Sequence, residues 1–222
     1  MEHKRLTLFA GHYGSGKTNI AVNYAMLLAK EGKKVCIADL DIVNPYFRTK
    51  DSERELTELG ISMISPRYAN TNVDLPALPA ESYRLVQDRS VFGVADIGGD
   101  DRGAYALGRF ADAIKAEDNY RMAFVINRHR PLTSTVRDTL EIMREIEAAS
   151  GIPFNCIVNN SNIGSETTPE TFLGSVAFAE EVSLAAGLPI WLHTAEKCVA
   201  KGISEISVFP LTLQKKYFDL PD

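Results

Sequence analysis

The chain has 222 residues, of which 24 are Lys or Arg and 29 are Asp or Glu, so its formal net charge is −5 at pH 7. A hydrophobic content of 45% and a charged content of 24% are typical of a globular protein and exclude a disordered or collagenous chain. The acidic balance argues against nucleic acid or an anionic membrane as a general partner.

The length and the cysteines narrow the class of protein further. At roughly 150 residues per domain, we expect a single domain over residues 1–222. Cys36, Cys156 and Cys198 are too far apart to suggest a metal-ligand set, so we expect buried thiols in a reducing compartment. The sequence has no run of about 18 apolar residues and no signal-peptide core, so we expect a cytoplasmic protein without a membrane span.

Short apolar runs alternate with segments of helical period along the chain. We expect strands at residues 6–10, 34–39, 61–65, 91–96, 121–127, 154–159 and 189–193. We expect helices at residues 17–30, 104–116, 134–150 and 169–186. The strands are continuously apolar, as burial on both faces requires. This order predicts an α/β fold in three layers, with a mostly parallel twisted sheet of about seven or eight strands and helices on both faces.

The strongest motif lies between the first strand and the first helix. Residues 11–18, with the sequence GHYGSGKT, fit the phosphate-loop pattern G-x-x-x-x-G-K-[ST]. In this pattern backbone N–H groups and the helix N-terminus face the phosphates, Lys17 reaches the β- and γ-phosphates, and Thr18 binds Mg²⁺. A glycine-rich turn that binds nothing would not need Lys-Thr at this register. We therefore predict nucleotide contacts from Gly11, His12, Tyr13, Gly14, Ser15, Gly16, Lys17, Thr18 and Asn19.

Carboxylates follow two other predicted strands. The second strand ends in Asp39-Leu-Asp41, and the fourth ends in Asp96-Ile-Gly-Gly. Because parallel strands end at the same edge of a sheet, we expect Asp39 and Asp96 to share one magnesium shell with Thr18, Asp96 being the Walker-B carboxylate. The glycines after Asp96 would bring a backbone N–H close to the γ-phosphate. Taken singly, each aspartate also fits a helix cap or a turn.

Three segments resemble the MinD/ParA/CobQ-type nucleotide-binding proteins of the SIMIBI class of P-loop NTPases: GHYGSGKT, IADLDIVNPYF and VADIGG. The resemblance spans roughly residues 6–193, and D-L-D-I after the second strand selects this branch. It implies that Asp39 supports magnesium and that Asp96 holds magnesium through water. It also implies that Asp41 positions or activates the attacking water, so Lys17 and Asp41 are the predicted catalytic residues.

The phosphate loop departs from the pattern of this family at two positions. The family's loop reads K-G-G-x-G-K-[ST], and its first lysine reaches across a dimer to the partner's nucleotide. Here His12 and Tyr13 replace that Lys-Gly pair. Since His12 is shorter and mostly neutral at pH 7, it does not supply the same charge. Four arginines could substitute, although each also fits a solvated surface residue: Arg48, Arg102, Arg128 and Arg130.

The end of the sixth predicted strand bears on the choice of base. It reads Asn159-Asn160-Ser161-Asn162, where GTP-binding relatives carry N-K-x-D. An aspartate there accepts two hydrogen bonds from guanine, whereas an asparagine presents one acceptor and a donor that faces another donor. Such an unpaired donor costs about 1–3 kcal/mol, so we expect ATP to be preferred to GTP. The resemblance implies that Asn159 or Asn160 lies beside the adenine, and a turn rich in asparagine is the alternative.

Together these features predict an ATP-binding P-loop protein, a slow Mg²⁺-dependent ATPase that acts as a nucleotide-controlled switch or assembly factor. Its cofactors would be ATP and Mg²⁺, and its partner would be a second copy or an unidentified protein. Nucleic acid is not expected, because no basic surface helix is visible. Residues 44–49, directly after D-x-D, are expected to form a switch loop or a packed proline turn.

Two other functions stay open at the level of sequence. The first is an ATP-dependent ligase or synthetase acting on a small carboxylic acid, similar to cobyrinic acid synthase and dethiobiotin synthetase. In that enzyme Arg67, Tyr68 and Arg102 would hold the carboxylate. The second is a nucleotide-binding module without turnover.

Overall fold

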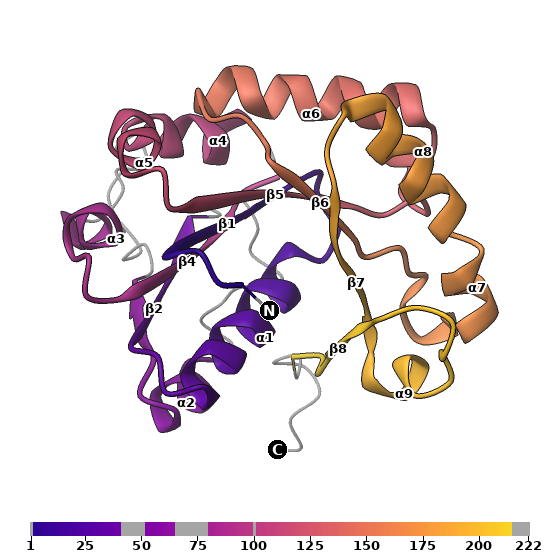
Figure 1. Ribbon diagram of the computed structural model, residues 1–222, viewed down its shortest axis with the longest axis horizontal. Coiled ribbons are helices and arrows are strands. Elements are labelled where there is room, and N and C mark those ends of the chain that lie inside the picture. Colours follow the sequence, from indigo (N-terminus) through magenta and orange to yellow (C-terminus); the bar gives the residue numbers. More distant parts are fainter. Residues whose placement is uncertain (1, 41–51, 65–79, 100, 215–222) are drawn as a thin grey trace, which may run out of the picture.

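The computed structural model describes residues 2–40, 52–64, 80–99 and 101–214, and within these it leaves out the side chains of residues 80, 101 and 102. The segment expected to form a switch loop, 44–49, and the candidate carboxylate-binding residues Arg67 and Tyr68 lie outside the described residues. The described strands form one eight-stranded sheet in the order β3-β2-β4-β1-β5-β6-β7-β8, and all the registered pairs are parallel (Figure 1). The predicted α/β class and the parallel sheet are confirmed.

The strands and helices alternate along most of the chain. The strands are β1 (Leu6–Ala10), β2 (Val35–Leu40), β3 (Ser62–Ile64), β4 (Phe92–Ile97), β5 (Tyr120–Ile126), β6 (Cys156–Asn159), β7 (Ile190–Glu196) and β8 (Phe209–Leu211). The α-helices are α1 (Lys17–Lys30), α2 (Glu53–Glu58), α3 (Arg84–Gln87), α4 (Asp101–Gly108), α5 (Ala111–Glu117), α6 (Val136–Ser150), α7 (Pro169–Leu173), α8 (Val176–Ala186) and α9 (Lys197–Ala200). Short 3-10 turns lie at Ala80–Tyr83, Pro131–Thr133 and Gly164–Glu166.

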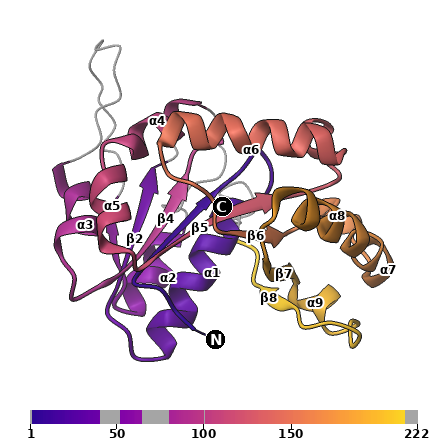
Figure 2. The same ribbon diagram turned by 45° about the horizontal axis from the view of Figure 1, so that its top comes forward.

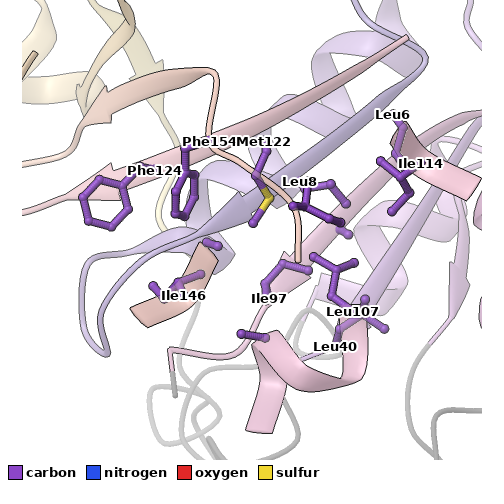
Figure 3. Close-up of a cluster of buried hydrophobic side chains, with 14 of the residues drawn as sticks. Leu6, Leu8, Leu40, Ile97, Leu107, Ile114, Met122, Phe124, Ile146 and Phe154 are labelled. Atoms are coloured by element: carbon purple, nitrogen blue, oxygen red, sulfur yellow. The ribbon is translucent and has the colours of Figure 1, made fainter. Parts of the chain in front are cut away.

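Side chains alternate across the sheet and so divide the core into two layers. In β1, Leu6 and Leu8 pack with α4, α5, α6 and α8, whereas Phe9 packs on the opposite face with α1. Figure 3 shows the first layer, where Leu8 lies near Leu107 of α4 and Ile97 of β4. Each buried side chain of this size contributes about 1.5–3 kcal/mol to folding. Figures 1 and 2 show the sheet lying between the two helix layers, as predicted.

Two predicted helices are each divided into two in the structure. The helix expected at 104–116 is α4 and α5. The break between them contains Phe110, whose side chain is buried and whose backbone N–H donates to the Leu107 carbonyl at 2.9 Å. The helix expected at 169–186 is α7 and α8, which are separated at Gly174 and Ser175. There the Ser175 hydroxyl donates to the Phe172 carbonyl at 2.6 Å and turns the chain. Apolar periodicity alone does not reveal such breaks, which depend on local hydrogen bonds.

One prediction about the cysteines is wrong. Cys36 and Cys156 are buried in β2 and β6, and burial raises the pKa of the Cys156 thiol to about 12. Cys198 is exposed, because it lies on the one-turn helix α9 beyond the end of β7. No helix of the described residues is both long enough and apolar enough to cross a membrane.

Candidate nucleotide-binding site

The phosphate loop, residues 11–18, joins the carboxyl end of β1 to the start of α1. Its central turn is closed by the Ser15 N–H, which donates to the His12 carbonyl at 3.1 Å. Gly16 caps α1 with φ at 89°, a left-handed conformation that glycine adopts without a Cβ penalty. The loop therefore has the backbone geometry for which the motif selects its glycines.

The N-terminus of α1 has the features of an anion-binding site. Gly16 provides no side-chain cap, and the first turn contains no acidic residue. The first ladder bond runs from Ile20 N–H to the Gly16 carbonyl at 3.3 Å, so the N–H groups of residues 17–19 precede the ladder. Lys17 and Thr18 are only 5% and 7% exposed, and Lys17 Nζ donates to the His12 carbonyl at 3.2 Å. The positive end of the helix dipole and a buried ammonium thus converge on one small loop.

The loop after β4 is pressed against the phosphate loop. A Cβ built on Gly99 would lie 2.6 Å from the backbone nitrogen of Tyr13 and 3.0 Å from the carbonyl carbon of His12. Any side chain at this position would push the two loops apart, so a glycine is required by close approach. The predicted convergence of the β1 and β4 loops is present in the structure.

Two buried aspartates lie beside this loop on neighbouring strands. Asp39 of β2 and Asp96 of β4 are paired in register, and Asp96 is also paired with Phe9 of β1. Alternation places both aspartates on the α1 face, because Ile37 and Val94, two residues earlier, pack in the α1 layer. Their exposures are 2% and 0%. Sequence reasoning expected the two aspartates close together at one edge of the sheet, and their pairing in register places both carboxylates on the α1 face.

This donor set fits Mg²⁺. Magnesium prefers oxygen ligands and in nucleotide sites takes only one or two from carboxylates, the rest coming from phosphates and water. The described residues contain no group of three or more His, Cys, Asp or Glu that could hold a metal ion. Thr18, Asp39 and Asp96 are the described residues that would hold the ion. The predicted catalytic Asp41 lies outside the described residues.

His12 is held in its neutral form. Partial burial lowers its pKa, and the nearby charges of Lys17 and Arg130 lower it further, while a hydrogen bond to the Tyr13 carbonyl acts in the opposite direction. The histidine therefore brings no fixed charge to the phosphate loop at pH 7.

The two arginines after β5 take different directions. Arg130 Nε donates to the Gly14 carbonyl of the phosphate loop at 2.9 Å. Arg128 instead donates to the Gly174 carbonyl at 2.8 Å and stacks over the Phe178 ring. The other two candidate arginines fall where the structure gives no side chain: Arg48 and Arg102.

The asparagine loop, residues 159–162, lies on the other side of the phosphate loop. Asn160 Nδ2 donates to the Ser15 carbonyl at 2.7 Å, and its Oδ1 accepts from the Thr194 hydroxyl at 2.7 Å. Asn159 is fully buried, and its amide donates to the Ser175 hydroxyl at 3.1 Å and accepts from Ser161. Both amides thus have protein partners, and the adenine contact implied for them stays a prediction.

Two polar residues that support this region were missed by the sequence analysis. Thr194 braces Asn160 and lies one residue beyond the strand expected at 189–193, since β7 continues to Glu196. Asn127, directly after β5, accepts from the Asn162 N–H at 3.2 Å and donates to its carbonyl at 3.1 Å. The only sequence signal for either is a polar residue following an apolar strand.

The side chain of Asn19 faces away from this network. Its Oδ1 accepts from the Gln214 N–H at 3.0 Å, and one turn later Asn23 exchanges two hydrogen bonds with the backbone of Thr212. These contacts hold the segment after β8 against α1. A nucleotide contact from Asn19, which was predicted, would therefore come from its backbone.

The fold and the site define a class. A parallel sheet whose first strand leads through a glycine-rich loop into a helix N-terminus, beside buried strand-end carboxylates, is that of a P-loop nucleotide-binding protein. Residues 6–183, well over half of the chain, match the CobQ/CobB/MinD/ParA nucleotide binding domain, and the chain belongs to this family. The resemblance drawn from the three motifs is confirmed, and with it the SIMIBI class. No curated protein sequence gives a significant match.

Solved structures of signal-recognition proteins share the fold. The cell division protein FtsY of Thermotoga maritima has a TM-score of 0.59 and 16% identity, covering 86% of this chain and 61% of that chain. The signal recognition particle 54 kDa protein of Aeropyrum pernix K1, solved in complex with GDP, has a TM-score of 0.57 and 17% identity, covering 86% of this chain and 41% of that chain. This chain thus spans about half of the length of these proteins, and at such identities the likeness concerns the fold alone.

Proposed function

We propose that this chain is a cytoplasmic ATP-binding protein, a slow Mg²⁺-dependent ATPase whose nucleotide state controls a protein partner. The observation that carries the proposal is the pairing of Asp39 and Asp96 on the α1 face, next to the phosphate loop. The two carboxylates offer oxygen ligands of the kind that Mg²⁺ takes from a protein in a nucleotide site. A nucleotide bound in the phosphate loop would bring its magnesium ion next to these oxygens.

The preference for ATP is supported by the asparagine loop. Asn162 stands where a guanine-binding aspartate would stand, and its side chain is engaged locally. Its Nδ2 donates to the Asn160 carbonyl at 2.7 Å, and its Oδ1 accepts from the Gly164 N–H at 3.2 Å. An amide held in this way offers no pair of acceptors to the two donors of a guanine edge.

The residues divide the chemistry of hydrolysis between them. Lys17 and the N–H groups of residues 17–19 would bind the phosphates and offset the charge that develops on the γ-phosphoryl group. Thr18, Asp39 and Asp96 would hold Mg²⁺, which when bound neutralises the β- and γ-oxygens. Asp41 would orient the attacking water. We expect the isolated chain to hydrolyse ATP slowly, because His12 does not supply a positive charge at the phosphate loop.

The switch is supported by the contact between the β4 and β1 loops. Gly99 lies directly against the backbone of Tyr13, so a group bound in the phosphate loop adjoins the start of α4. A γ-phosphate that draws the Gly99 N–H inward would move this loop, and its loss would release it. The partner is either a second copy or another protein, and native mass spectrometry with and without ATP distinguishes these.

The proposal is tested by calorimetric titration and single-turnover hydrolysis. We expect Mg·ATP to bind the unmodified chain more tightly than Mg·GTP, and hydrolysis to be slow. Asp41→Ala should bind Mg·ATP within a few-fold of the unmodified chain but lose turnover, because the water is no longer positioned. Tighter binding of GTP, or fast hydrolysis by the isolated monomer, would contradict the proposal.

A further inference from the structure

A guanidinium group lies against the phosphate loop at Gly14. Arg130 Nε donates to the Gly14 carbonyl at 2.9 Å. The position that a Cβ on Gly14 would take is 3.1 Å from Arg130 Nε and 3.2 Å from its Cζ. The charged group therefore packs against the α-carbon of Gly14, and a Cβ at this position would crowd it.

The backbone around Arg130 is anchored on both sides. The Arg130 N–H donates to the Asn127 carbonyl at 3.1 Å, and its carbonyl accepts from the Thr133 N–H at 3.0 Å. Thr133 is fully buried, and its hydroxyl donates to the Asn127 carbonyl at 2.7 Å. Pro131 follows, and Arg130 has the extended conformation that a residue before proline favours. This arginine is thus held beside the phosphate loop by structure that continues directly from β5.

Most of the hydrogen-bonding capacity of Arg130 is unused within the described part of the chain. Of its five N–H donors, Nε–H alone has a partner among the described residues, and the side chain is exposed to solvent. Its charge is close enough to lower the pKa of His12. Arg128, two residues earlier, has no such freedom, because the Gly174 carbonyl and the Phe178 ring hold it elsewhere.

We propose that Arg130 is a phosphate-contacting residue, which presents its terminal nitrogens to the polyphosphate of a bound nucleoside triphosphate within the same chain. The inference rests on the proposed nucleotide binding and deepens it by assigning the cation that His12 does not provide. A guanidinium makes two parallel hydrogen bonds to a phosphate group. Since Arg130 is already positioned by Gly14, little conformational entropy is lost when the nucleotide binds.

The test compares the affinities for Mg·ATP and Mg·ADP by calorimetry. In Arg130→Ala we expect ATP to bind about tenfold more weakly or worse, and ADP to lose less, because it carries one phosphate fewer. The ATP affinity of Arg130→Lys should lie between those of the unmodified chain and Arg130→Ala, because lysine keeps the charge but lacks the planar guanidinium group. The matched control is Arg137→Ala, which removes the same charge from an exposed position on α6 and should bind both nucleotides within twofold of the unmodified chain.

Each outcome separates this inference from the proposed function. If the unmodified chain binds ATP and Arg130→Ala binds it equally well, the assignment of Arg130 is overturned and the proposed function stands. Equal losses for ATP and ADP would also overturn it, because Arg130 would then act only by bracing the loop at Gly14. If the unmodified chain binds neither nucleotide, the proposed function fails and the inference fails with it. Thermal unfolding without nucleotide checks that all variants are folded.

Discussion

The phosphate loop and the asparagine loop touch each other, yet the two are specified in different ways. In residues 11–18 the backbone itself forms the site, so glycines stand where the chain must adopt a left-handed conformation, as at Gly16. In residues 159–162 side-chain amides make the hydrogen bonds that hold the loop, and their partners lie in β7 and in the loop after β1. The contrast teaches that a site made of backbone leaves a readable motif, whereas a site made of tertiary hydrogen bonds does not.

Among substitutions in the two loops, we expect Gly16→Ala to have the largest effect on the affinity for Mg·ATP. The new Cβ would overlap the amide of Asn160 and also carry the left-handed φ penalty of about 1–2 kcal/mol. Displacing the Asn160 amide from the Ser15 carbonyl adds about 1–3 kcal/mol. With the loop displaced, we expect the affinity for Mg·ATP, measured by calorimetry, to fall about 100-fold, as loss of two charge-assisted bonds would produce.

Gly32→Ala is the matched control for this substitution. Gly32 has a similar φ of 79°, but nothing lies within 4 Å of the position of its Cβ. We expect the φ penalty of about 1–2 kcal/mol in urea unfolding, with unchanged nucleotide affinity. Equal effects of the two substitutions on nucleotide affinity would show that crowding at Asn160 is not what shapes the phosphate loop.

A smaller effect is expected where the two loops meet. Asn160→Ala leaves the Ser15 carbonyl without its amide donor and leaves the Thr194 hydroxyl only its longer contact, to the Asn159 carbonyl at 3.3 Å, so we expect a loss of stability of about 1–3 kcal/mol. Thr194→Val removes the other side of one of these bonds. A double-mutant cycle by urea unfolding should give a coupling of about 0.5–3 kcal/mol. Strict additivity of the two substitutions would contradict the hydrogen bond between Asn160 and Thr194.

The smallest effect is expected from protonation of His193, which contacts Asn159 of the asparagine loop and lies edge to face with the Phe172 ring of α7. Burial lowers the pKa of this histidine, with Glu180 acting in the opposite direction. Its Nδ1 lies 3.3 Å from Asn159 Nδ2, a donor, so the contact requires an unprotonated Nδ1.

The direction of the pH dependence follows from this lowered pKa. The contribution of His193 to stability is complete above its unfolded pKa of about 6.5 and decreases as the pH falls toward the lower folded value. We expect urea unfolding to show a smaller loss of stability between pH 7.5 and pH 5.5 in His193→Gln than in the unmodified chain. The other histidines are present in both proteins, so an identical loss in both would contradict a role of His193.

The fold and the phosphate loop of the candidate site could be predicted from the sequence, because both leave patterns in short stretches of the chain. Apolar runs marked the buried strands, and parallel strands end at the same edge of a sheet, so Asp39 and Asp96 could be expected to lie close together, as their pairing shows. The support of Asn160 by Thr194 could not be foreseen, because the two residues are 34 positions apart and meet only when β7 pairs with β6. The sequence also did not reveal that Arg130, and not Arg128, lies against the phosphate loop, because this depends on the backbone contacts between Arg130 and Thr133.

The most direct test of the central claim is calorimetric titration of Mg·ATP into the unmodified chain and into Lys17→Ala. Lys30→Ala, which removes an exposed lysine from the last turn of the same helix, is the matched control. The account predicts saturable binding to the unmodified chain and to Lys30→Ala, and a loss of about 10-fold to 100-fold in Lys17→Ala, because a buried ammonium that contacts the phosphates is removed. Equal affinities for all three proteins, or no binding by the unmodified chain, would contradict it.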